Sequence, residues 1–170
     1  MPRIRGIETM RKIAFGFAAA AAVAATPAFA GTATNNMPVS VNVINSCTVA
    51  ASPMNFGGVT SIGGAPINTT SSIALTCTNG ASYDVALDNG THASGSQRNL
   101  ANGAVTIPYN IYLDAGRTSA WGNTSGTNTV AGIAGSTGLV SLTAYGQIPA
   151  SATSVTAGSY TDTVTVTVTF

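Results

Sequence analysis

The chain has 170 residues, of which six are Lys or Arg and five are Asp or Glu, so that its formal net charge is +1. Four of the basic residues lie within the first twelve positions; beyond residue 30 two arginines stand against four aspartates, a net charge of −2 without any lysine. This composition excludes the basic surface that binds nucleic acid or anionic lipid. The many β-branched residues and the low charge density also exclude ordinary disorder.

The first thirty residues have the three parts of a secretory signal. A basic start ends at Arg11 and Lys12, an apolar run covers Ile13 to Ala25, and Ala28-Phe29-Ala30 is a small-x-small cleavage site. The apolar run is short for a membrane-spanning helix, which needs about 20 residues. We therefore expect residues 1–30 to be a signal peptide, cleaved after Ala30, with either Met1 or Met10 as the start.

The segment after the signal alternates between apolar and polar residues, which is typical of a strand. "NMPVSVNVINSCTV" places its apolar side chains at odd positions over about thirteen residues, or about 43 Å at 3.3 Å per residue, whereas strands typically hold five or six. No strong turn separates its first half from Cys47, so that half cannot easily fold back into its own domain. The side chains concerned are Met37, Val39, Val41 and Val43.

Cys47 and Cys77 are the only cysteines, and an exported protein with two cysteines most simply joins them in a disulfide. Metal binding by the two thiols is the weaker alternative, because the chain has a single His. In the chain-entropy model, a loop of roughly thirty residues corresponds to about 3 to 4 kcal/mol of stabilisation.

Further period-2 segments follow at the spacing expected of a β-sandwich, separated by Gly, Asn, Ser and Pro. Pro108 lies within one of them and lacks a backbone donor, so it indicates a sheet edge or a bulge. Nothing beyond Ala30 has a helical period, and we expect an all-β antiparallel sandwich. The segments are "SIALTCT", "SYDVALDNG", "AVTIPYNIYLDAG" and "LVSLTAYGQI".

The last ten residues, "TDTVTVTVTF", alternate strictly up to Phe170, with no following strand. The two ends are therefore complementary, one a strand without a sheet and the other a sheet edge without a strand. Addition of one molecule's N-terminal strand to the next molecule solves both problems and generates an open filament. We expect a donor segment at 31–45 and a sandwich domain at 46–170. The sandwich would be incomplete until a neighbour completes it.

The chain resembles the spore coat protein U domain family, which includes subunits of archaic, Csu-type chaperone-usher pili. The resemblance covers essentially all of residues 31–170 and rests on "VSVNVINSCTV", "FGGV", "IALTCTNG", "YDVALDNG", "IPYNIYLDAGRTSAWG" and "AGSYTDTVTVTVTF". The most specific stretches are Tyr109 to Trp121 and the terminal Tyr-Thr-Asp-Thr-Val run.

The resemblance implies an incomplete immunoglobulin-like sandwich in a surface fibre used for cell adhesion and biofilm formation. A periplasmic chaperone would lend a strand to the open groove and hold the carboxylate of Phe170 in a basic cleft. An outer-membrane usher would then exchange that strand for the N-terminal strand of an identical or related subunit. The same analogy makes Met37, Val39, Val41 and Val43 the donor side chains. It makes Val164, Val166, Val168 and Phe170 the border of the acceptor groove.

Catalytic, metal and cofactor sites have little support in the sequence. His92 lies in a polar, Gly-rich loop, and the nucleophile elbow of a serine hydrolase is absent. Asp84 and Asp88 occupy the polar face of a predicted strand, and we interpret them as solvated; Trp121 is better explained by packing than by binding. The alternatives to a fibre subunit are a self-complete secreted binding module for carbohydrate or another surface, a spore or cell coat protein, and, least supported, an exported hydrolase.

Overall fold

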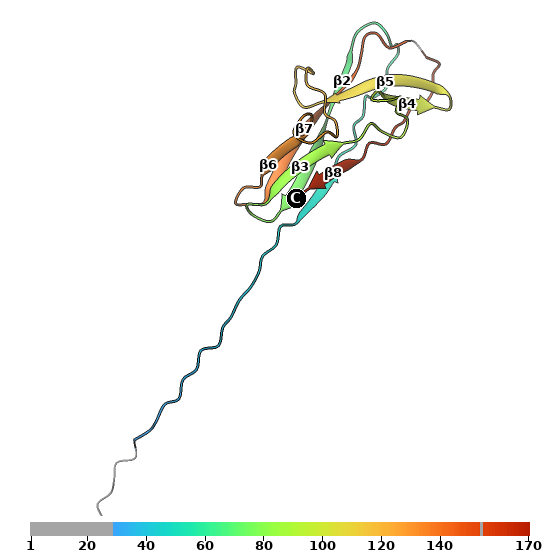
Figure 1. The fold of residues 1–170 in the computed structure, drawn as a ribbon. Helices are drawn as coiled ribbons and strands as arrows, with labels where there is room; N and C mark the ends of the chain where they lie inside the picture. Colours follow the sequence, from blue (N-terminus) through green and yellow to red (C-terminus); the bar gives the residue numbers. More distant parts are fainter. Residues whose placement is uncertain (1–28, 154) are drawn as a thin grey trace, which may run out of the picture. The chain divides into compact units, whose positions relative to one another are not determined.

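The computed structural model of the protein describes residues 29–153 and 155–170, and the predicted signal lies almost entirely outside them. The described residues contain no helix, and hence none long and apolar enough to cross a membrane. The chain divides into two units, residues 1–40 and 41–170, and all the strands belong to the second (Figure 1). They are β1 (Cys47–Ala51), β2 (Ile67–Cys77), β3 (Ser82–Leu87), β4 (Arg98–Asn102), β5 (Val105–Tyr112), β6 (Val130–Ile133), β7 (Leu139–Ile148) and β8 (Val166–Thr169).

Two antiparallel sheets form the sandwich, one in the order β1-β2-β7-β5-β4 and the other in the order β6-β3-β8. The pairing of β2 with β7 is the longest, running from Ile67 opposite Ile148 to Thr76 opposite Leu139. The all-β antiparallel sandwich predicted from the alternation is confirmed.

Alternating side chains of both sheets meet in the core because successive residues of a strand point to opposite faces. Leu75 of β2 and Val85 and Leu87 of β3 are almost completely buried. Trp121 is 1% exposed, and its Nε1 donates a hydrogen bond to the carbonyl oxygen of Val85 at 2.9 Å. Trp121 thus packs in the core, as the sequence favoured.

Arg98 is buried at the start of β4, with 3% exposure, although the chain has few charges. Its guanidinium donates hydrogen bonds to the carbonyl oxygens of Leu87, Asp88 and Trp121 at 2.7 to 3.2 Å. A buried cation is tolerated only when its donors are satisfied. Arg98 therefore joins β4 of the large sheet to the end of β3 in the small one.

The pairing of β5 explains why a proline can lie within this strand. β4 pairs with β5 from Val105 to Tyr109, whereas β7 pairs only with Asn110 to Tyr112. Pro108 is thus paired on one side alone, so the missing N–H costs no ladder hydrogen bond on the other. The strand is an interior strand near Tyr112 and an edge at Pro108.

Replacing Trp121 by Ala should lower the free energy of unfolding by about 3 to 5 kcal/mol, the usual cost of removing a large buried aromatic side chain. Trp121→Phe should cost less, because a ring remains and only the indole donor is lost. Urea unfolding followed by circular dichroism measures both. Thr124→Ala is the control, since Thr124 is exposed and such changes usually stay within about 0.5 kcal/mol; an equal loss in this variant would contradict the assignment.

Candidate functional site

β8 is an edge strand of the small sheet. Among the described residues it pairs with β3 alone, Leu87 lying opposite Val166 and Val85 opposite Val168. Just before β8, the carbonyl oxygens of Thr163 and Thr165 accept hydrogen bonds from the N–H groups of Thr91 and Asp88. Because backbone groups alternate in direction along a strand, the residues at even positions aim their N–H and C=O groups at the opposite, unpaired edge. These residues are Val164, Val166 and Val168.

An apolar groove opens beside this edge. A cavity of about 320 Å³ lies between the end of β1, at the edge of the large sheet, and β8, at the edge of the small one. Core residues of both sheets form its floor, among them Ile73, Leu87 and Ile111. A second cavity of about 470 Å³, with a more polar lining, shares Met54, Phe56 and Leu100 with the first, so open space continues beyond it.

The predicted acceptor residues lie in different positions along this groove. Val164, Val166 and Val168 are half-buried and pack against the core, and the first two line the cavity. Phe170 is 52% exposed and does not join the core. The C-terminal alternation is therefore a half-buried row of valines with a free backbone edge, followed by an exposed aromatic side chain.

The predicted donor residues are all exposed. The described residues before Cys47 belong to no strand, and each residue from 29 to 46 is exposed. β1 takes up only the last part of the alternating run that begins at Met37. The exposed fractions are 83% for Met37, 84% for Val39, 88% for Val41 and 73% for Val43.

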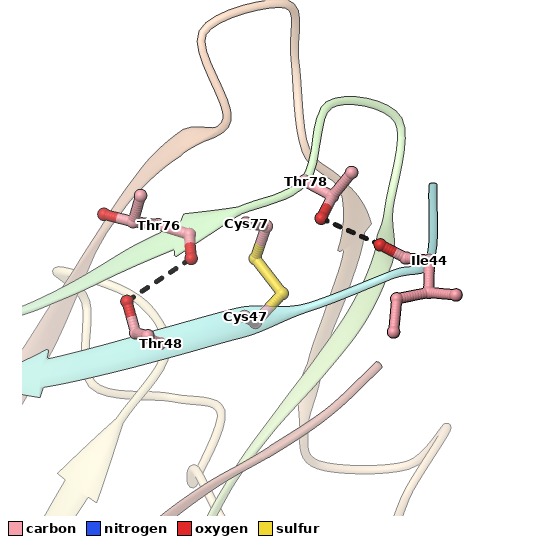
Figure 2. The surroundings of a disulfide bond; sticks show 6 residues. All are labelled: Ile44, Cys47, Thr48, Thr76, Cys77 and Thr78. Atoms are coloured by element: carbon pink, nitrogen blue, oxygen red, sulfur yellow. Dashed lines mark hydrogen bonds between the residues drawn. A yellow bond between two sulfur atoms is a disulfide. The ribbon is translucent and has the colours of Figure 1, made fainter. Parts of the chain in front are cut away.

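The disulfide ties the start of β1 to the end of β2, as Figure 2 shows. Cys47 and Cys77 lie directly opposite each other in the ladder, and the disulfide predicted from their number is present. Thr78 holds the residues just before Cys47: its N–H donates to the carbonyl oxygen of Ser46 at 2.8 Å and its Oγ1 to that of Ile44 at 3.2 Å. The chain is thus fastened to the sandwich from Ile44 onward.

Asp162 connects the groove wall to the loop after β3. Its side chain is 1% exposed and accepts hydrogen bonds from Tyr109 Oη at 2.7 Å, Thr91 Oγ1 at 2.9 Å and the His92 N–H at 3.1 Å. His92 Nδ1 lies 3.1 Å from the same carboxylate. Burial raises the pKa of Asp162, but the hydrogen bonds outweigh it and hold that pKa below the ordinary value of 3.8.

The pKa of Tyr109 is shifted upward, whereas that of Asp162 is shifted downward. Burial, and then its hydrogen bond to Asp162, raise the pKa of the Tyr109 phenol above 10. The phenol therefore remains a donor to Asp162 throughout the ordinary pH range. Gly90 allows the loop to come this close, because it has a φ of +81° and a Cβ there would overlap the carboxylate of Asp162.

Asp88, the residue directly after β3, also holds the segment that leads into β8. Its carboxylate accepts the N–H of Gly90 and of Thr165, each at 2.9 Å. Burial raises the pKa of Asp88, yet the Thr165 and Gly90 hydrogen bonds and the charge of Arg98 bring it below 3.8. The interpretation of Asp88 as a solvated residue was therefore wrong, because the chain leading to β8 passes over it.

The remaining candidates do not form a catalytic arrangement in the part of the chain that the structure describes. His92 is a loop residue with a side chain 44% exposed, beside a carboxylate that already accepts three other donors. Among the described residues, no three His, Cys, Asp or Glu side chains come together as a metal site would require. Sequence reasoning missed Asp162, Tyr109 and Arg98. The available signal was the inclusion of Tyr109 and Asp162 in the two most specific stretches of the family resemblance.

Comparison with known proteins adds to this geometry. A family model for the Spore Coat Protein U domain matches residues 33–167. The chain belongs to the Spore Coat Protein U domain family. Protein U of Myxococcus xanthus is 36% identical to it over 172 residues, covering 90% of this chain and 93% of that protein. The family assignment made from the sequence is confirmed.

The same domain fold occurs in a solved pilus complex. One chain of the CsuC-CsuE chaperone-tip adhesion subunit pre-assembly complex, from the archaic chaperone-usher Csu pili of Acinetobacter baumannii, matches with a TM-score of 0.55 at 22% identity. The match covers 75% of this Spore Coat Protein U domain chain and 40% of the Csu chain, so this chain spans well under half of that chain's length. At this identity the likeness shows a shared fold.

The carboxylates of Asp162 and Asp88 make the stability of the domain depend on pH. Asp162 and Asp88 have pKa values lowered in the folded state, so they stabilise it fully above their unfolded pKa near 3.8 and less as the pH falls through their folded values. Asp162→Asn should lower the free energy of unfolding at neutral pH by about 1.5 to 3 kcal/mol, the range for hydrogen bonds to a charged group. The free energy of unfolding of this variant should also fall less steeply than that of the wild type as the pH is lowered.

Urea unfolding at several pH values between neutrality and acid measures this difference. Thr163→Ala serves as the control, because the Thr163 side chain is exposed and its backbone hydrogen bond is retained. Parallel curves for the wild type and Asp162→Asn would show that Asp162 does not carry the acid dependence.

Proposed function

We propose that this protein is a structural, non-enzymatic subunit of a surface fibre of the chaperone-usher type that polymerises by donor-strand complementation. Residues 31–45 of one copy lie in the groove of the next, beside β8. The observation that carries the proposal is the coexistence of an unpaired edge over an open apolar groove with an exposed segment of matching alternation. Residues 46–170 form the receiving domain, and residues 1–30 are a signal removed on export.

The donor side chains would bury in the groove on one face of the added strand. Burying Met37, Val39, Val41 and Val43 contributes roughly 6 to 12 kcal/mol as an upper figure, at about 1.5 to 3 kcal/mol each. Ordering about ten residues opposes this by about 1 to 2 kcal/mol per residue. Backbone hydrogen bonds to the free edge at Val164, Val166 and Val168 supply the remainder, together with removal of the core floor from water.

The exposed groove indicates which partner proteins the subunit needs during assembly. A groove of this kind needs an occupant before the next subunit arrives, and a periplasmic chaperone that lends a strand provides one. The Csu complex is described as a chaperone-tip adhesion subunit pre-assembly complex, and its shared fold supports this role. An outer-membrane usher completes the exchange, which places the fibre on the cell surface after passage through the periplasm. Cell adhesion and biofilm formation are the roles such a fibre serves.

A coat built from the same contacts is the second candidate. The description of the family and its relative, Protein U, favour it. Because a coat and a pilus can use the same strand exchange, the two share the donor and acceptor residues proposed above.

Val41→Asp in the exported chain should abolish the ladder of oligomers that resist detergent at room temperature. The carboxylate would enter an apolar groove, and burying it without a partner costs several kcal/mol. This exceeds the roughly 1.4 kcal/mol that corresponds to a tenfold loss of association. Gel electrophoresis without heating, on protein exported together with its chaperone, measures the ladder.

Asn42→Asp is the matched control, since it introduces the same charge at the neighbouring position on the polar face of the strand and should leave the ladder intact. A synthetic peptide of residues 35–45 should raise the melting temperature of a chain that lacks residues 31–43, and the Val41→Asp peptide should not. A wild-type chain that is a heat-stable monomer without chaperone would overturn the proposal.

A further inference from the structure

The outer face of the large sheet has no role in the fibre proposed above. The groove lies on the core side of this sheet and at its β1 edge, whereas alternate residues of β2, β5 and β7 point away from the core. These three adjacent strands contain no Asp, Glu, Lys or Arg. The strands themselves therefore contribute polar side chains but no formal charge to this surface.

Two rows of side chains cross this face, because the strands are in register. Asn68 of β2, Gln147 of β7 and Asn110 of β5 lie opposite one another and form an amide row. Gln147 Nε2 donates a hydrogen bond to Asn68 Oδ1 at 3.0 Å. Gln97 Nε2 donates to Asn110 Oδ1 at 3.5 Å. Since each amide has two donor hydrogens and an acceptor oxygen with two lone pairs, the row keeps capacity for a ligand.

The second row carries two aromatic rings. Tyr145 of β7 lies directly opposite Tyr112 of β5, and both residues are half-buried. The two rows touch, because Asn110 Nδ2 donates to Tyr112 Oη at 3.4 Å. Tyrosine offers a large rigid surface with a hydrogen-bonding tip, at a low cost in conformational entropy.

Arg117, from the loop after β5, reaches β2 and β7 between the two rows and has a strained backbone conformation. Its φ is 57°, the one positive value among the non-glycine residues described. The guanidinium donates to the carbonyl oxygens of Gly146 and Thr69 at 3.2 and 3.3 Å and lies 5.8 Å from the centre of the Tyr145 ring. These contacts hold the ring in place, and a strained residue kept by such contacts is a feature found at binding sites.

We propose that this face, the amide row together with Tyr112 and Tyr145, binds a neutral polysaccharide. The apolar face of a sugar ring would stack on a tyrosine, while its hydroxyl groups exchange hydrogen bonds with the neighbouring amides. Adjacent strands are about 4.7 to 4.9 Å apart, so the amides repeat on the scale of one sugar unit of an extended chain. The strands contribute no charge and the Arg117 guanidinium is engaged by backbone carbonyl oxygens, so the face lacks the cluster of positive charges that nucleic acid or an acidic polymer requires. In a fibre the face would recur on every subunit and raise the avidity.

Retention of the exported chain on insoluble cellulose and on cross-linked dextran tests this proposal. The wild type should bind at least one of the two, and binding should persist in about 1 M NaCl, where charge attraction is screened. Tyr112→Ala and Gln147→Ala should each weaken retention by about tenfold or more, equivalent to the loss of one good contact. Ser141→Ala is the matched control, being exposed on the same face of the same strand outside the rows, and should bind as the wild type does.

Soluble cellohexaose and dextran oligosaccharides provide a second measurement that needs no variant. In the NMR spectrum of the wild type they should shift the signals of Asn110, Tyr112, Tyr145 and Gln147 before those of the groove residues. Absence of binding to both polymers, binding abolished by salt, equal loss in Ser141→Ala, or shifts confined to the groove would each overturn the proposal. Since the oligomer ladder is scored separately and the face lies away from the groove, failure here leaves the fibre assignment unaffected.

Discussion

An unpaired strand edge beside an open core is the constraint on which the rest of this structure depends. β8 has a partner on one side only, and the cavity next to it reaches core residues of both sheets. Free backbone groups and apolar surface each favour association, and here they lie together. A segment of the same chain offers apolar side chains at the spacing that fits such an edge. In the polymer that we propose, this unpaired edge accounts for both the open groove and the exposed apolar side chains from Met37 to Val43.

The edge has to stay ordered while it lacks its second neighbour. A strand with hydrogen-bonded neighbours on both sides would be well ordered but would have no free edge. β8 and the residues before it have backbone hydrogen bonds to β3 and the loop after it, on one side. Asp88 and Asp162 strengthen that side, because carboxylates accept several donors at once and their hydrogen bonds are stronger than neutral ones. Asp88 bonds the segment that leads into β8 from the β3 side, and Asp162 is part of the groove wall itself. β8 can therefore stay ordered while its other edge remains unpaired.

Local alternation could predict much of this fold, and tertiary contacts decided the rest. The cores of β2, β3, β5 and β7 all lie within segments identified by their period, and the cysteine count sufficed for the disulfide. β4 was not predicted, because "RNLAN" shows no period and its burial depends on carbonyl groups 10 to 23 residues away from Arg98. Asp162 meets Tyr109 and Thr91 across 53 and 71 residues, so no local pattern could show the site. Asp88 was misread for the same reason.

The two faces of the large sheet show how a chain with few charges separates its tasks. The inner face supplies the apolar floor of the groove, and on the outer face the strands carry amides, hydroxyl groups and tyrosines but no charged residue. Charged residues commonly protect exposed sheet edges from unwanted pairing. In this sheet β1 and β4 stand at the two ends of the strand order, although β1 pairs only with Ile73–Cys77 of β2 and β4 only with residues 105–109 of β5. Because β2, β5 and β7 contribute no charge to their outer face, that face suits the ligand that we propose, one that binds through hydroxyl groups, and occupying it would leave the free edge of β8 available for assembly.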